Sequence, residues 1–88
     1  MKIVNLDRNL IKIINANKKD YMIASYNTII VLYRAEDEKY YINDYMKKST
    51  NTTFRHFKNA MGESYKDFIK HHKCELVSNE LFFNELFF

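Results

Sequence analysis

The sequence contains no proline, no tryptophan, one glycine and one cysteine. The single Cys74 cannot form a disulfide within the chain or build a zinc site alone, so a reducing cytoplasm is the expected location. With one glycine, the chain has no glycine-rich loop of the kind that cradles nucleotide phosphates. No apolar run reaches the roughly 18 residues of a membrane-spanning helix, and the first residues lack the apolar stretch of a signal peptide. We therefore expect no membrane partner.

What the chain does contain predicts a folded protein. Apolar residues make up 47% of its 88 residues and aromatic residues 16%, which is too much for a disordered chain. The length predicts a single small domain, residues 1–88, with one modest core. Lysine, asparagine, isoleucine, tyrosine and phenylalanine are frequent, as expected of an AT-rich genome in a low-GC bacterium or its phages.

Residues 1–17 fit two kinds of structure. Leu6, Leu10, Ile13 and Ile14 follow a helical spacing, with Asp7 as a candidate N-terminal cap. The isoleucine-rich part of this segment would equally form an edge strand, because β-branched side chains favour extended backbone. We slightly favour the helix, followed by a polar turn over residues 15–20.

Residues 21–33 carry the clearest strand pattern. The segment is longer than usual strands, so a bend or bulge is expected over residues 25–28. Charged residues 34–38 predict a turn, and residues 39–45 predict a second strand that completes a β-hairpin. Residues 73–77 predict a short third strand.

The segment after residue 50 predicts helices. Phe54, Phe57 and Met61 share one helical face, and Gly62 stands where a helix C-terminal cap belongs. Thr52 or Thr53 is expected to cap the start of this helix. Further helices are expected over residues 63–72 and 81–88. The fold class is therefore α+β: a β-hairpin extended to a small antiparallel sheet, with helices packed on one face.

Positive charge is concentrated in the middle of the chain. The net charge is +3, but residues 47–73 alone hold seven basic and two acidic residues and all three histidines. Such a stripe either contacts phosphates or an acidic protein surface, or it is a solvated lysine face. The candidate residues for binding a partner or nucleic acid are Lys47, Lys48, Arg55, His56, Lys58, Lys66 and Lys70.

No pattern in the sequence indicates catalysis. Adjacent histidines on a helix point about 100° apart, so His71 and His72 are not expected to share a metal ion. Cys74, at the start of a strand, is expected to be a small buried residue. Asp37 and Glu38 belong to a solvated turn and form no acid–base pair. We expect no enzyme activity, no cofactor and no metal.

Aromatic residues supply two candidate interfaces. Tyr40 and Tyr41 crowd the predicted hairpin, either as cross-strand packing or as a recognition surface. The last eight residues contain Phe82, Phe83 and Phe87, which would pack on the hairpin or against a second chain, either in a homodimer or in the groove of a partner protein.

The chain contains the strand motif Ser-Tyr-Asn-Thr at 25–28, then Lys39-Tyr40-Tyr41, and then Thr52-Thr53 followed by Arg55-His56. Together these stretches resemble a module of small phage and plasmid proteins from low-GC bacteria. The resemblance spans Tyr21 to Met61. This copy departs from the pattern by extra residues before Thr52 and by Phe54. The resemblance implies an origin in a mobile element and no particular activity.

These observations support three hypotheses for function. The first is a non-catalytic phage or mobile-element accessory protein that binds and inhibits a host macromolecule, such as a CRISPR or other defence nuclease, by analogy of size and setting. The second is a small basic nucleic-acid-binding protein. The third is a structural homodimer.

Overall fold

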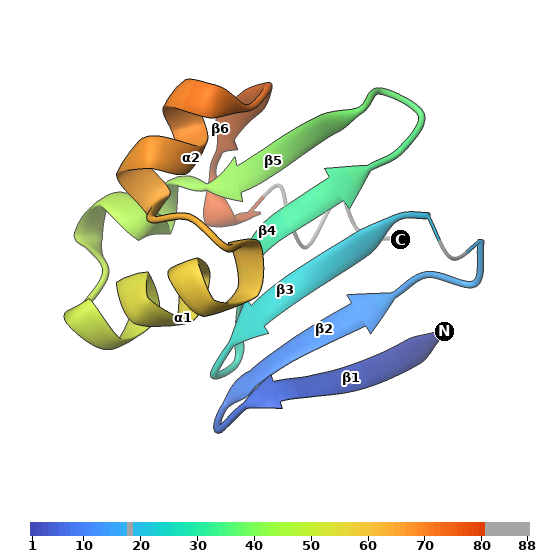
Figure 1. The fold of residues 1–88 in the computed structure, drawn as a ribbon, viewed down its shortest axis with the longest axis horizontal. Helices are drawn as coiled ribbons and strands as arrows, with labels where there is room; N and C mark the ends of the chain where they lie inside the picture. The colour runs from blue at the N-terminus through green and yellow to red at the C-terminus, as the bar shows by residue number, and fades with distance from the viewer. Residues whose placement is uncertain (18, 81–88) are drawn as a thin grey trace.

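The computed structural model describes residues 1–17 and 19–80, in which a six-stranded sheet lies beside two α-helices (Figure 1). The strands follow one another across the sheet in sequence order. The α+β class expected from the sequence is confirmed. The elements are β1 (Lys2–Asp7), β2 (Leu10–Ile14), β3 (Tyr21–Ser25), β4 (Thr28–Arg34), β5 (Lys39–Asn43), the 3-10 helix η1 (Asp44–Lys48), α1 (Asn51–Met61), α2 (Tyr65–His71) and β6 (Cys74–Val77).

The helix favoured for residues 1–17 is wrong. β1 and β2 form an antiparallel hairpin in which Ile3 pairs with Ile13, and β2 also pairs with β3, so β1 is the edge strand. The turn contains Asn9 at φ 60°, a left-handed conformation that asparagine tolerates better than most residues. The β-branched side chains on either side of this turn favour extended backbone, and that preference prevails over the helical spacing.

The segment expected to be one long strand is instead a second hairpin. β3 ends at Ser25 and β4 begins at Thr28, and these two residues pair directly. Tyr26 and Asn27 therefore make a tight two-residue turn. A β-bulge does occur, but it lies farther along: Ile23 and Ala24 of β3 pair with Val31 and Ile29, which leaves one extra residue in β4.

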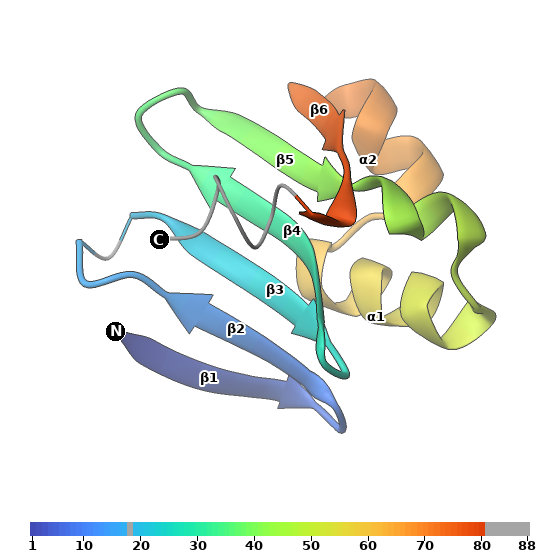
Figure 2. The same ribbon diagram turned by 180° about the vertical axis from the view of Figure 1, so that it is seen from behind.

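The last strand joins the sheet in the opposite sense from the others. β6 pairs parallel with β5, with Tyr40 opposite Cys74, so this edge differs from the antiparallel pairing expected and found in the rest of the sheet. A parallel neighbour requires a long crossover connection, which η1, α1 and α2 supply. Both α-helices lie on one side of the sheet, as the two opposite views show (Figures 1 and 2).

The helix ends follow standard capping chemistry. Thr50, and not Thr52 or Thr53 as expected, is the N-cap of α1, and its hydroxyl accepts the Thr53 N–H at 3.4 Å. The expected cap at Gly62 is confirmed, with φ 82°. No helix within residues 1–17 and 19–80 has the length and apolar character that a membrane crossing requires.

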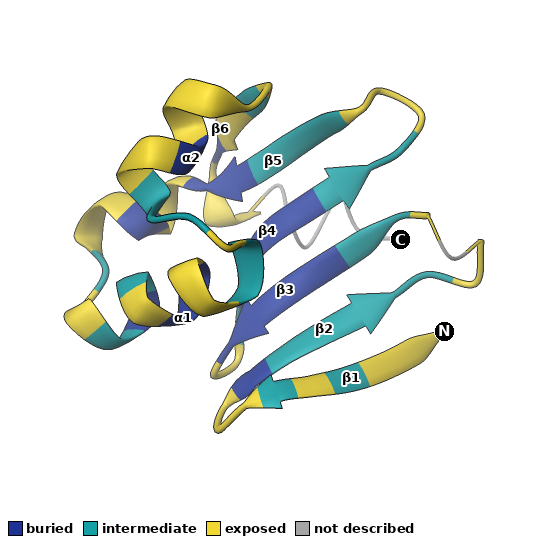
Figure 3. Ribbon diagram, viewed as in Figure 1, coloured by how far each residue is buried: buried dark blue, intermediate teal, exposed yellow. Residues whose placement is uncertain are grey.

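Buried side chains occupy both faces of the sheet. Phe57 of α1 and Phe68 of α2 pack onto the helix-covered face, against residues that include Leu10, Ile23 and Ile42. The opposite face holds a second buried cluster of Met22, Ala24, Ile29, Leu32 and Val77. The central strands are accordingly the most buried part of the fold, whereas the outer surfaces of α1 and α2 are largely exposed (Figure 3).

Candidate functional site

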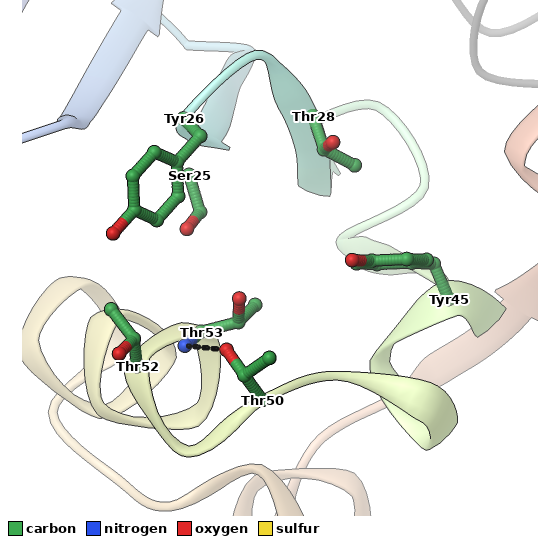
Figure 4. A pocket seen from close by; sticks show the side chains of 7 residues that line it. All are labelled: Ser25, Tyr26, Thr28, Tyr45, Thr50, Thr52 and Thr53. Carbon is green, nitrogen blue, oxygen red and sulfur yellow. Dashed lines mark hydrogen bonds between the residues drawn. The ribbon is translucent and has the colours of Figure 1, made fainter.

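The Ser-Tyr-Asn-Thr turn and the Thr-rich start of α1 meet around one cavity (Figure 4). The cavity has a volume of about 410 Å³ and lies between the β3–β4 turn, η1 and the N-terminus of α1. Each hydroxyl can both donate and accept a hydrogen bond, so the cavity offers polar contacts without a charge of its own. All the side chains that line it carry a hydroxyl: Ser25, Tyr26, Thr28, Tyr45, Thr50, Thr52 and Thr53.

A buried hydrogen bond fixes the two halves of this cavity to each other. Ser25 Oγ at the end of β3 lies 2.7 Å from Nδ1 of His56 on α1. Ser25 and His56 are each only 3% exposed. His56, which the sequence placed among the partner-binding residues, therefore uses one of its ring nitrogens within the fold.

Tyr26 has a backbone conformation that bulky residues rarely adopt, with φ 56°. Its N–H donates to the Asn9 carbonyl at 2.7 Å, which ties the β3–β4 turn to the β1–β2 turn. Its ring centroid lies 5.7 Å from that of His56, yet 54% of the residue stays exposed. Strained residues of this kind cluster at functional sites, and the contacts with Asn9 and His56 hold the Tyr26 ring at the rim of the cavity.

The other cationic candidates lie on the exposed surface of the helices. They come from η1, α1 and α2, and none of them forms an ion pair with any residue that the structure describes. Unpaired cations on one layer are free to contact an anionic partner. We call this set the basic helical layer: Lys47, Lys48, Arg55, Lys58, Lys66 and Lys70.

Glu63 joins the two adjacent histidines that the sequence had suggested would point apart. Glu63 Oε2 lies 2.9 Å from His71 Nδ1, and Oε1 lies 2.8 Å from His72 Nε2. This geometry is possible because α2 ends at His71 and His72 is already extended. Hydrogen bonds from His72 and then His71 lower the pKa of Glu63 below its usual range. Among the described residues no group of three potential ligands is placed to hold a metal ion.

The two candidate tyrosines lie on opposite faces of the sheet. Tyr40 belongs to an aromatic row on the helix-covered face, with ring centroids 4.8 Å from both Tyr33 and Phe68. Tyr21 extends the row at 5.3 Å from Tyr33, and burial together with Tyr40 raises the pKa of Tyr21. Tyr41 donates instead to Asp37 at 3.1 Å on the other face. The structure therefore does not combine Tyr40 and Tyr41 into one surface.

Some features of the site were not evident in the sequence. The sequence indicates Ser25 only as part of a bend and does not single out Thr50, whereas the structure places both in the wall of one cavity. The density of hydroxyl residues in both segments was the available signal. The candidates Phe82, Phe83 and Phe87 lie outside the described residues, so their role as an interface stays a prediction.

Residues 1–76 match a family of unknown function, DUF8033. The chain belongs to the DUF8033 family. The match begins before β1 and extends into β6, so the hydroxyl cavity and the basic helical layer both lie in the DUF8033 part of the chain. No curated protein and no solved structure matches the chain.

Proposed function

We propose that this protein is a non-catalytic binding protein whose basic helical layer and hydroxyl cavity contact the phosphate backbone of a nucleic acid. The observation that carries the proposal is a set of six exposed cations on η1, α1 and α2 without ion-pair partners among the described residues, together with a cavity lined by seven hydroxyl side chains at the start of α1. Lysine, arginine, serine, threonine and tyrosine side chains, together with helix N-termini, make most protein contacts to nucleic-acid backbones.

The charge distribution supports a contact through this layer. Residues 47–73 hold seven basic and two acidic residues, while the rest of the chain holds seven basic and nine acidic. Among the described residues, Glu63 is engaged with His71 and His72, which reduces the repulsion it would exert on a phosphate. A basic face on an otherwise slightly acidic protein orients the molecule as it approaches a polyanion.

A second candidate function is inhibition of a host macromolecule, such as a CRISPR or other defence nuclease, by an accessory protein of a phage or plasmid acting in the host cytoplasm. The motif at residues 25–28 and the Arg55-His56 pair support it, because they resemble a module of small phage and plasmid proteins. In that case the basic helical layer would contact an acidic surface of the host protein.

The experiment compares two double variants of equal charge change. Lys66→Gln with Lys70→Gln removes two cations from the basic helical layer, and Lys2→Gln with Lys19→Gln removes two exposed cations elsewhere. Fluorescence anisotropy measures binding to a duplex of about 20 base pairs over a range of salt concentrations. Each phosphate contact contributes about 0.9 to the slope of log affinity against log salt, so the first variant should reduce the slope by up to about 2.

The control variant should bind with the slope of the unmodified protein. Absence of duplex binding at low salt would contradict nucleic-acid binding. Stoichiometric inhibition of a purified defence nuclease, lost in the Lys66 and Lys70 variant but retained in the control, would then support the second candidate. Equal effects of both variants would show that the interaction depends only on overall charge.

A further inference from the structure

A second cavity, of about 360 Å³, adjoins the hydroxyl cavity, since Tyr26 and Thr52 line both. Its walls come from the β1–β2 turn and from one side of α1, and they include Arg8, Arg55 and His56. On α1 the spacing of Thr52, Arg55 and His56 places the three residues on one helical face. Two guanidinium groups and a histidine thus meet at one recess, although Arg8 and Arg55 are far apart in sequence.

The second ring nitrogen of His56 faces this recess without a partner. His56 is only 3% exposed, and its single hydrogen bond among the described residues uses Nδ1, with Ser25. Every fully buried side-chain nitrogen or oxygen in the described part of the chain has a hydrogen-bond partner. Nε2 of His56 has none, so it is not fully buried and opens into the recess that His56 lines. When Nδ1 accepts a hydrogen bond from the Ser25 hydroxyl, the neutral ring carries its proton on Nε2. The doubly protonated ring also carries a proton on Nε2. In both of these protonation states Nε2 is a hydrogen-bond donor.

The start of α1 adds to the positive potential of the recess. α1 has 11 residues and no acidic residue in its first turn, so its N-terminal dipole is not compensated from within the helix. Thr52, in that first turn, lies at the rim with its hydroxyl. Helix N-termini with nearby donors bind phosphate groups readily.

One carboxylate also lies in the wall, and its charge has to be weighed. Asp7 Oδ1 accepts the Arg8 N–H at 2.7 Å, and Oδ2 accepts a hydrogen bond from Asn59 Nδ2 at 3.2 Å. Both carboxylate oxygens are therefore engaged with protein donors. Two guanidinium groups against one carboxylate leave the recess with a positive balance before the His56 donor is counted.

From this arrangement we propose that the recess between the β1–β2 turn and α1 is a binding site for a phosphoryl group, held by Arg8, Arg55 and Nε2 of His56. Planar guanidinium groups match the tetrahedral oxygens of a phosphate in bidentate contacts, and the imidazole N–H supplies a directional third donor. This site is separate from the backbone contact of the proposed function, because a free phosphate ion can occupy it without any nucleic acid.

The test is a titration with inorganic phosphate at low ionic strength, followed by calorimetry and by the 15N shift of His56 Nε2. Arg8→Gln and Arg55→Gln each remove one cation from the recess, and both residues are exposed, so these variants should fold. Lys2→Gln is the matched control, since Lys2 is an exposed cation that lies neither in the recess nor in the basic helical layer. We expect each arginine variant to lose affinity about tenfold and the control to stay within about twofold.

Two further probes identify the source of the phosphoryl group. A short single strand with a 5′-phosphate should bind more tightly than the same strand without it if the recess takes a terminal phosphate, and Arg55→Gln should abolish the difference. Equal binding of the two strands assigns the recess to free phosphate. The Lys66 and Lys70 double variant should keep its phosphate affinity, which separates this site from the duplex contact. Absence of phosphate binding up to about 10 mM, an unmoved His56 Nε2 signal, or an equal loss in Lys2→Gln overturns the proposal.

Discussion

Ser25 Oγ and His56 Nδ1 lie 2.7 Å apart in the interior of the protein, and this bond connects the end of β3 to the middle of α1. The turn that follows Ser25 carries Tyr26, and the helix that carries His56 also carries Arg55 of the basic helical layer. The bond therefore fixes the turn motif relative to the cationic surface. It also sets which nitrogen of His56 is left for a ligand.

Ser25→Ala should destabilise the protein by about 1–3 kcal/mol, because it leaves Nδ1 of a buried imidazole without a partner. Urea unfolding followed by circular dichroism measures the change in the free energy of unfolding. Glu36→Ala, at an exposed position in the β4–β5 turn, is the control and should stay within about 0.5 kcal/mol of the unmodified protein. Equal midpoints for the two variants would show that the bond contributes no stability.

Thr50→Ala should lower the stability by about 1 kcal/mol, since it removes the oxygen that accepts the Thr53 N–H. In a domain of this size the melting temperature should fall by about 4–8 °C. Thr52→Ala leaves the cap in place and should have a smaller effect. A larger fall for Thr52→Ala than for Thr50→Ala would mean that α1 is capped as the sequence first suggested.

Gly62→Ala isolates the cost of backbone conformation. A Cβ atom at Gly62 would meet nothing within 4 Å, but the residue has φ 82°. The left-handed conformation costs a residue with a side chain about 1–2 kcal/mol, so Gly62→Ala should be less stable by that amount. Asparagine tolerates this conformation better, and Gly62→Asn should recover part of the loss in thermal unfolding. Indistinguishable Ala and Asn variants would argue against strain as the cause.

Glu63 gives the protein an acid-sensitive contribution to stability. Its pKa is lowered from 4.5, chiefly by hydrogen bonds from His72 and His71. A carboxyl group with a lowered folded-state pKa stabilises the fold above its unfolded-state pKa, and that contribution is lost as the pH falls through the lower folded-state value. Glu63→Gln should therefore flatten the dependence of stability on pH below about 4.5, whereas Glu36→Gln in the β4–β5 turn should not. An unchanged profile in Glu63→Gln would contradict the role of this contact.

Local chemistry was enough to predict the later elements of the fold. Phe57 and Met61 recur at helical spacing and Gly62 ends the pattern, so α1 could be anticipated within a few residues. The N-terminal hairpin could not, because Leu6 and Leu10 satisfy a helical spacing as well as an alternating one over so short a segment. The bend expected over residues 25–28 is a tight two-residue turn, a form that the sequence does not indicate, because a bulky residue with positive φ is rare and tertiary contacts with Asn9 and His56 hold Tyr26 there.

The candidate site was predictable only in part. Exposed cations such as Lys66 and Lys70 are recognisable from their number and from the helix that carries them. The pairing of Ser25 with His56, and the meeting of Arg8 with Arg55, depend on how two turns and a helix come together in three dimensions. Contacts between residues so distant in sequence follow from the sheet register, which a single sequence does not specify.

The most direct test of the central claim, that the basic helical layer is the binding surface, is amide chemical-shift mapping with a duplex of about 20 base pairs at low salt. We expect shifts concentrated in η1, α1 and α2, around Lys48, Arg55, Lys58, Lys66 and Lys70, and we expect them to fade as salt is added. Residues on the opposite face of the sheet, such as Ile13 and Tyr41, should not respond. Shifts centred on that face, or no shifts at low salt, would contradict nucleic-acid binding by the basic helical layer.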